Sequence, residues 1–315
     1  MINNKFPKVM FIGGFGRSGS TLLERMLGQT DGFFVIGELR HIWERSFTEN
    51  QLCGCGKPFK SCEFWRQVVA EVFGSFERVP LEQIIELKRS IDRIQFVPQM
   101  VTPFKLKEYH QKFKDYSSIL TEIYRTIQAL SGCDVIVDSS KDHSYGHLLA
   151  SIKEIDLFTL HLIRDSRATA FSWSRKKRRP EIHWTIEYMP QYTPLRSSLI
   201  WTLMNLSISS IRNRRGQYLR IRYEDMVSDP TGTLAQVLEF LGESDKRLDF
   251  IKNKVVRLGL NHTVSGNPIR FEQGHMEIRA DNEWRSQMKK KDFHLVTLLT
   301  WPLLMNYGYL SANKM

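Results

Sequence analysis

One glycine-rich run, GGFGRSGSTLLERML at residues 13–27, constrains the fold of this 315-residue chain more than any other feature. It follows the apolar stretch at residues 9–12, so the sequence reads as a buried strand, a turn and a helix. Glycines allow a turn to adopt positive φ and allow a ligand to approach the backbone closely. Because the N–H groups at a helix start attract anions, we predict an anion-binding loop rather than a turn that only packs.

The spacing of the loop is that of a nucleoside triphosphate-binding loop with one replacement. Four residues separate Gly14 from Gly19, and Ser20 occupies the next position, where such loops carry lysine. The cation is instead Arg17, inside the turn, where a guanidinium can donate two parallel hydrogen bonds to an anionic group. This replacement favours a nucleotide without a β,γ-phosphate pair and its Mg²⁺, and it argues against a P-loop kinase or NTPase.

The charge of the chain points to an anionic ligand. A net charge of +11 fits an anionic small molecule, an acidic substrate or nucleic acid. We expect no nucleic-acid partner, because the basic run at 175–179 lacks interleaved aromatic residues and belongs to no module signature. We also expect a cytoplasmic protein without a membrane anchor, since the first strand lies near the start of the sequence. Residues 293–313 carry no charged side chain, but they contain Pro302, so we predict a docked C-terminal helix there.

Short apolar segments alternate with helical patterns along most of the chain. The expected strands are residues 8–13, 33–36, 134–137, 157–163 and 218–222. This alternation predicts an α/β fold, a P-loop-like parallel sheet flanked by helices. The length fits one large domain or two smaller ones. We predict a single domain over residues 1–315, with a helical insertion at about 64–130 that forms a lid or substrate wall.

Polar residues follow these strands at the ends where ligands of parallel sheets bind. Glu38 follows the second strand, Lys141 the third and Arg164 the fourth, while Tyr223 and Glu224 follow the fifth. Each has a structural alternative, such as a helix cap or an ion pair. Their common position favours a single site beside the anion loop.

Three of the four cysteines lie in the segment CGCGKPFKSC, as Cys53, Cys55 and Cys62. The segment lacks the paired C-x-x-C spacing of zinc sites and offers no fourth local ligand. A structural loop is therefore favoured, and a zinc or redox role stays open.

Two motifs together resemble those of the sulfotransferases that use 3′-phosphoadenosine 5′-phosphosulfate (PAPS), and the resemblance extends from the first strand to the C-terminal YGY. GRSGSTLL is similar to the 5′-phosphosulfate loop, in the arginine form of Golgi carbohydrate and tyrosylprotein sulfotransferases. LIRDSRATAFSWSRK is similar to the 3′-phosphate signature, which implies that Arg164 and Ser172 hold that phosphate. The first motif implies donor-binding roles for Gly16, Arg17, Ser18, Gly19, Ser20 and Thr21.

Further likeness to tyrosylprotein sulfotransferases, and to bacterial sulfotransferases with LCGCG and SGNP-x-RF segments, implies roles for other residues. Glu38 would be the catalytic base, and Lys141 would contact the sulfuryl group. Tyr223 would contact the nucleotide, and Ser265 would contact the phosphosulfate end. The arginine after the serine of the 3′-phosphate motif is shifted here by one position, so Arg175 departs from the pattern.

The resemblance implies in-line transfer of a sulfuryl group from PAPS to a hydroxyl, releasing 3′-phosphoadenosine 5′-phosphate (PAP). Arg17 and Lys141 would stabilise charge on the leaving oxygen, so no metal is required. A small molecule, a carbohydrate or a tyrosine-containing acceptor would fit equally. The alternatives are a P-loop kinase or NTPase, and a non-catalytic nucleotide- or polyanion-binding protein.

Overall fold

The central sheet has five strands, all parallel, in the order β2-β3-β1-β4-β5. A computed structural model describes residues 6–101, 107–215 and 217–310. The strands are β1 (Lys8–Gly13), β2 (Phe33–Gly37), β3 (Val135–Lys141), β4 (Asp156–Ile163) and β5 (Tyr218–Arg222). All five overlap the predicted segments, although β3 continues four residues beyond its predicted end at Val137. The predicted α/β class is therefore confirmed.

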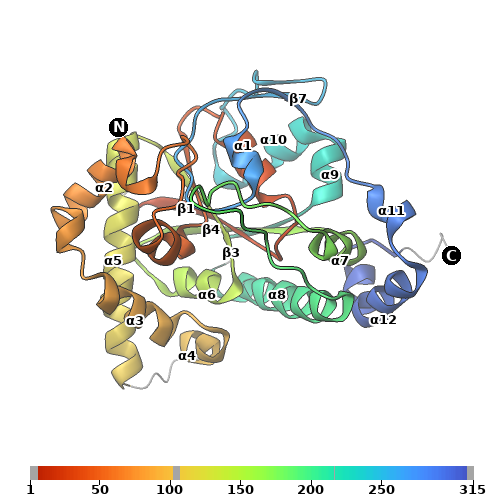
Figure 1. Ribbon diagram of the computed structural model, residues 1–315, viewed down its shortest axis with the longest axis horizontal. Helices are drawn as coiled ribbons and strands as arrows, with labels where there is room; N and C mark the ends of the chain where they lie inside the picture. Colours follow the sequence, from red (N-terminus) through yellow and green to blue (C-terminus); the bar gives the residue numbers. More distant parts are fainter. Residues whose placement is uncertain (1–5, 102–106, 216, 311–315) are drawn as a thin grey trace.

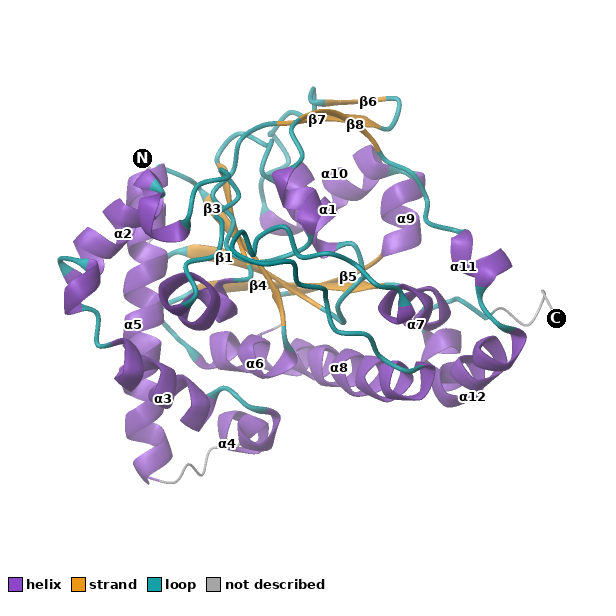
Figure 2. Ribbon diagram, viewed as in Figure 1, coloured by secondary structure: helices purple, strands orange, loops and turns teal. Residues whose placement is uncertain are grey.

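Helices cover both faces of the sheet (Figures 1 and 2). One face carries α1 (Ser20–Leu27), α9 (Tyr223–Ser228) and α10 (Pro230–Leu241); the other carries α6 (His143–Ser151) and α8 (Pro194–Arg215). Strand β1 is apolar after Lys8 because it is buried on both faces. Met10 and Ile12 pack with the first set of helices, and Val9 and Phe11 with the second.

The segment between β2 and β3 is mostly helical and lies at one end of the molecule in Figure 1. It comprises α2 (Glu63–Phe73), α3 (Leu81–Ile91), α4 (Val97–Val101) and α5 (Lys107–Ser131). Helix α5 buries Tyr109, Phe113, Tyr116, Leu120 and Tyr124, whose spacing of three to four residues places them on one helix face. That face packs into the core beneath β1 and β3.

The C-terminal part of the chain completes the fold. It contains α11 (Glu283–Gln287), α12 (Lys290–Asn306) and a small antiparallel sheet of β6 (Ile251–Lys252), β7 (Val255–Leu258) and β8 (Gly274–Glu277), which the sequence did not predict. Helix α12 packs against α8 and α7 (Ser166–Ser174) and continues through Pro302. It accounts for the helix expected at 293–313, of which residues 311–313 lie outside the described part. No helix within the described ranges is long and apolar enough to cross a membrane.

The anion loop follows β1, the strand at which the order of the sheet reverses. After β1 the chain forms β2 and β3 on one side of β1, and it then crosses to the other side to form β4 and β5. Ligands of open parallel sheets bind at the carboxyl ends of strands at such points.

Candidate functional site

The loop between β1 and α1 has the geometry of an anion cradle. Gly19 adopts φ +89°, and a Cβ atom added there would lie 2.5 Å from the ring of Tyr223. The N–H of Leu23 donates to the carbonyl of Gly19 (3.1 Å), which begins the helix. The N–H groups before Leu23 have no acceptor one turn earlier in the helix, so they are available to an anion.

Arg17 lies inside this turn in a left-handed conformation, with φ +73°. Its guanidinium lies over the Trp173 ring, 5.0 Å from the centroid. Two of its nitrogens, Nε and Nη2, are buried and have no hydrogen-bond partner among the described residues. Burial lowers the pKa of Arg17. A partly buried cation with buried, unused donors is suited to binding an anion.

Arg164 lies directly beside Arg17, at the carboxyl end of β4. Its Nη1 donates to the carbonyl of Arg17 (3.0 Å), and its guanidinium lies 4.4 Å from the centroid of the Tyr223 ring. Its Nη2 forms an ion pair with Asp281 (2.8 Å), and its Nε is buried without a partner in the described chain. The anion loop and the RDSR strand end therefore form one basic surface.

The other arginines near this strand end have different environments. Arg167 forms a buried, two-point ion pair with Asp165 (2.9 and 2.6 Å), so that carboxylate pairs with Arg167 and not with Arg164. Arg175 is exposed and pairs with Glu283. Arg175 therefore does not join Arg164 in the site.

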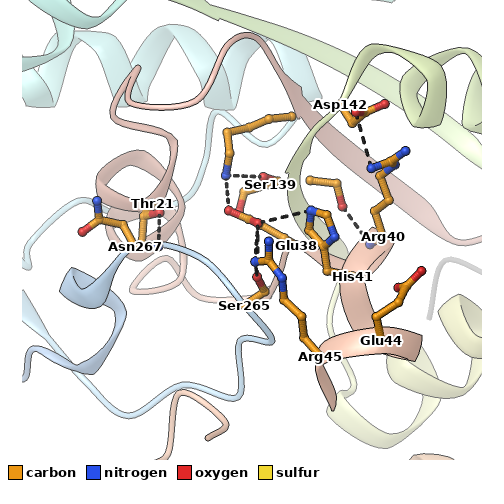
Figure 3. A network of polar contacts seen from close by, with 12 residues as sticks. Thr21, Glu38, Arg40, His41, Glu44, Arg45, Ser139, Asp142, Ser265 and Asn267 are labelled. Carbon is orange, nitrogen blue, oxygen red and sulfur yellow. Dashed lines mark hydrogen bonds and ion pairs between the residues drawn. The ribbon is translucent and has the colours of Figure 1, made fainter. Parts of the chain in front are cut away.

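Glu38 is the centre of a polar network (Figure 3). Its Oε1 accepts a hydrogen bond from Lys141 Nζ. Its Oε2 accepts one from Ser265 Oγ (3.2 Å) and lies 3.5 Å from Arg45 Nη1 and 3.8 Å from His41 Nε2. Arg45 also donates to Ser265. The carboxylate is thus held by groups from three segments: the end of β3, the loop that carries Ser265, and residues 41–45, which directly follow Glu38.

The cations around Glu38 determine its protonation state. Burial raises the pKa of Glu38, but the charges of Lys141 and Arg45 outweigh burial and lower the pKa to about 2. Burial also lowers the pKa of His41 well below its usual range, so this ring is neutral at pH 7. Glu38 is consequently a carboxylate at any physiological pH and can accept a proton.

Backbone strain coincides with the predicted site. Arg17, Lys141 and Ser265 all have φ between +58° and +73°, a region that non-glycine residues rarely adopt. At Lys141 the cause is a bulge: Phe11 pairs with Asp138, but Gly13 pairs with Lys141. Strained residues that cluster at one place are typical of functional sites.

Buried Glu24 positions Glu38, a role that no sequence motif indicates. Its carboxylate accepts hydrogen bonds from the backbone N–H of Gly37 (2.5 Å) and from Ser139 Oγ (2.7 Å). Glu24 lies in α1, so these hydrogen bonds link α1 to β3 and to the end of β2, directly before Glu38. Burial raises the pKa of Glu24 to about 7.

These groups surround a cleft of about 880 Å³ at the carboxyl edge of the sheet. Ser18 and Ser265 are buried next to it, at 2% and 4% exposure. The predicted site residues that line it are Gly16, Arg17, Gly19, Ser20, Thr21, Glu38, Lys141, Arg164, Ser172 and Tyr223.

Much of the remaining lining comes from residues 173–204, of which the sequence analysis singled out only the basic run at 175–179. Residues 173–204 contribute the aromatic side chains Trp173 and Tyr192, which stack at 4.4 Å, and the cations Lys177 and Arg179. The insertion between β2 and β3 reaches the cleft through Ile94. No motif predicts that Tyr192 and the apolar residues after it face the cleft, because their position depends on how a loop folds over the sheet.

A family model described as "Sulfotransferase family" matches residues 8–247. No curated protein matches at a significant level. Similar solved structures include the sulfotransferase domain from the curacin biosynthetic pathway (16% identity, TM-score 0.49, 94% of this chain and 99% of that one). Another is the sulfotransferase domain of the Synechococcus PCC 7002 olefin synthase (21% identity, TM-score 0.46, covering 98% of this chain and 98% of that one). A third is a sulfotransferase from Alicyclobacillus acidocaldarius (14% identity, TM-score 0.41, covering 95% of this chain and 96% of that one).

Proposed function

Since this chain belongs to the sulfotransferase family, we propose that it transfers a sulfuryl group from PAPS to an acceptor hydroxyl in the cleft described above. The observation that carries the proposal is the pair of buried, unused nitrogens of Arg17 beside the helix start. A phosphosulfate group supplies the acceptors that these donors lack. The absence of lysine at Ser20 fits a donor without a β,γ-phosphate pair.

The two ends of the donor would bind to different residues. The loop Gly16–Thr21 and Arg17 would hold the 5′-phosphosulfate. Arg164 and Ser172 would hold the 3′-phosphate, and Tyr223 would pack beside the nucleotide between Gly19 and Arg164. The 3′-phosphate would compete with Asp281 for Arg164, because the two anions need the same guanidinium.

Glu38 and Lys141 would carry out the chemical step. Glu38 takes the proton of the acceptor hydroxyl as the acceptor oxygen forms its bond to sulfur. The bond from sulfur to the bridging oxygen breaks, and its electron pair stays on the 5′-phosphate of the departing PAP. Lys141 and Arg17 stabilise the negative charge that develops on that oxygen, so the residues present need no metal for this step.

The ion pair between Glu38 and Lys141 suggests how the base becomes active. With Lys141 bound to it, Glu38 is a weak base, because its pKa is near 2. When Lys141 turns toward the donor anion, Glu38 loses a neighbouring positive charge and its pKa rises. Donor binding would therefore prepare the base for the acceptor.

The acceptor site would lie along the wall formed by residues 173–204. Its apolar side chains include Met189, Tyr192 and Leu203, and Lys177 and Arg179 add positive charge. A small molecule, a carbohydrate or a tyrosine side chain each offers the hydroxyl that Glu38 requires.

A thermal shift assay and a transfer assay together test the proposal. PAP should raise the Tm, whereas Mg-ATP should not, since the loop lacks the lysine of NTP-binding loops. Incubation with PAPS and a panel of phenols, sugars and alcohols should yield a product heavier by one sulfuryl group. Stabilisation by Mg-ATP alone would instead support a kinase or NTPase. PAP binding without transfer to any acceptor would support a non-catalytic binding protein.

A further inference from the structure

Three cysteines and a distant histidine gather at one point of the fold. Cys53, Cys55 and Cys62 come from the cysteine loop (residues 52–62), and His262 lies 200 positions after Cys62. Their ligand atoms all lie within 4.8 Å of one another. The His262 Nδ1 atom is 3.2 Å from Cys62 Sγ and 3.9 Å from Cys53 Sγ. None of the four cysteines, all within the described residues, is in a disulfide.

These separations match a tetrahedral zinc site. With Zn–S near 2.3 Å and Zn–N near 2.1 Å, neighbouring ligand atoms of a tetrahedron lie roughly 3.5–3.8 Å apart. The two measured S···N distances lie on either side of that range. Three thiolates and one imidazole form a ligand set typical of structural Zn²⁺.

The backbone of the cysteine loop is shaped to present its thiols on one side. The N–H of Cys53 donates to the carbonyl of Lys57 (2.8 Å), and Gly56 closes the turn with φ +82°. A Cβ atom on Gly54 would lie 1.9 Å from Asn261 Oδ1, so only glycine allows this close approach. Cys62 lies immediately before α2, where the helix N-terminus favours a negatively charged ligand.

His262 is also held in place. Its carbonyl accepts a hydrogen bond from Trp65 Nε1 (2.8 Å). Its ring stacks on Phe64 with centroids 5.3 Å apart and faces Phe34 at 6.5 Å. These contacts orient Nδ1 toward the thiols without a metal present, which reduces the entropy lost on metal binding.

We propose that Cys53, Cys55, Cys62 and His262 bind one structural Zn²⁺. Because the protein supplies all four ligands, the metal has no open position for a substrate or water. It would join the cysteine loop to the segment that follows His262. Nearby, Arg270 already links these two segments, because it donates to the carbonyls of Leu52 (2.5 Å) and Thr263 (2.6 Å).

The site lies next to the catalytic network. The N–H of Glu38 donates to the carbonyl of Val264 (2.7 Å), two residues after His262, and Ser265 follows. A metal bound to His262 would therefore fix the position of residues 262–265, which support Glu38. This role is independent of the sulfuryl acceptor and of the donor.

Metal analysis of the purified protein tests the site directly. Protein produced in zinc-supplemented medium and kept reduced should contain one zinc per chain. Cys55→Ser and His262→Ala should lose it, whereas Cys133→Ser, a change at a buried cysteine outside the cluster, should retain it. His262→Cys preserves a four-ligand set and should also retain zinc. These readouts do not depend on sulfotransferase activity.

Two measurements on the wild type cover the case of variants that do not fold. Exchange with Co²⁺ should produce the visible absorption of a tetrahedral, thiolate-ligated ion. A chelator should make three further thiols reactive and lower the Tm, and added zinc should reverse both changes. Wild-type protein without zinc and without a cobalt spectrum would overturn the proposal. A disulfide within the cluster in protein purified anaerobically, or equal metal loss in Cys133→Ser, would also overturn it.

Discussion

Replacing Glu38 with glutamine removes the negative charge of the side chain and keeps its size and shape. Glutamine keeps an oxygen for Ser265 or Lys141 but cannot accept the acceptor proton. Loss of a general base typically costs about 10²- to 10⁴-fold in rate, which corresponds to roughly 3–5 kcal/mol of transition-state stabilisation. We expect kcat to fall by that factor. The Kd of PAP should not rise, because the change leaves Arg17 and Arg164 intact and removes a competing negative charge from Lys141.

The same substitution should change how stability depends on pH. The pKa of Glu38 falls from 4.5 to about 2 on folding, which corresponds to at most about 3 kcal/mol. Arg45 is 31% exposed, so solvent screening reduces this to about 2 kcal/mol. A lowered carboxyl pKa stabilises the fold above pH 4.5, and that contribution disappears as the pH falls toward 2. The stability difference between wild type and Glu38→Gln should therefore vanish at acid pH.

Steady-state sulfotransfer, calorimetric titration with PAP and urea unfolding at several pH values measure these three effects. A Glu38→Gln protein with wild-type turnover would refute the role of Glu38 as base. A variant whose lost turnover is matched by an equal loss of PAP affinity would show that Glu38 acts through donor binding instead.

Three further variants test other parts of the account. Asp281→Asn should tighten PAP binding severalfold in calorimetry, because it removes the carboxylate that occupies Arg164; weaker binding would contradict that competition. Gly19→Ala should lower the Tm and weaken PAP binding, since its Cβ would collide with the ring of Tyr223 in a strained φ; an unchanged Tm would contradict this close packing. Wild-type stability should fall by up to about 3 kcal/mol between pH 4.5 and 7, because burial raises the pKa of Glu24 to about 7 and the folded state must then ionise it. Glu24→Gln should flatten this dependence in urea unfolding; an identical slope would contradict it.

Most of the sheet could be predicted because most of its strands begin as short apolar segments. Strand β1 is buried on both faces, so its residues after Lys8 are apolar without alternation, and the glycine-rich turn marks its end. Strand β3 was predicted to end at Val137, but it continues to Lys141. Its last four residues are polar, and they extend the sheet through a bulge that hydrophobicity does not reveal.

Contacts between distant segments were harder to predict. Glu38 and Lys141 were expected at the same edge because each lies at the carboxyl end of a parallel strand, and in the structure Lys141 donates a hydrogen bond to Glu38. Arg45 was missed because it reaches Glu38 from a π-helix, Ile42–Thr48, whose geometry has no simple sequence signal. The histidine of the cysteine cluster was missed for a related reason. His262 has no local spacing to the cysteines and joins them only through the tertiary fold.

The proposed function requires that one nucleotide is held at two points, by Arg17 at its 5′ end and by Arg164 at its 3′ end. Calorimetric titration with PAP and with adenosine 5′-monophosphate, which lacks the 3′-phosphate, distinguishes the two contacts. Arg164→Ala should weaken the binding of PAP by about tenfold to a hundredfold, the usual value of hydrogen bonds to charged groups, and leave that of the monophosphate unchanged. Arg17→Ala should weaken both ligands. Equal losses for both ligands in Arg164→Ala, or unchanged PAP binding in either variant, would contradict the account.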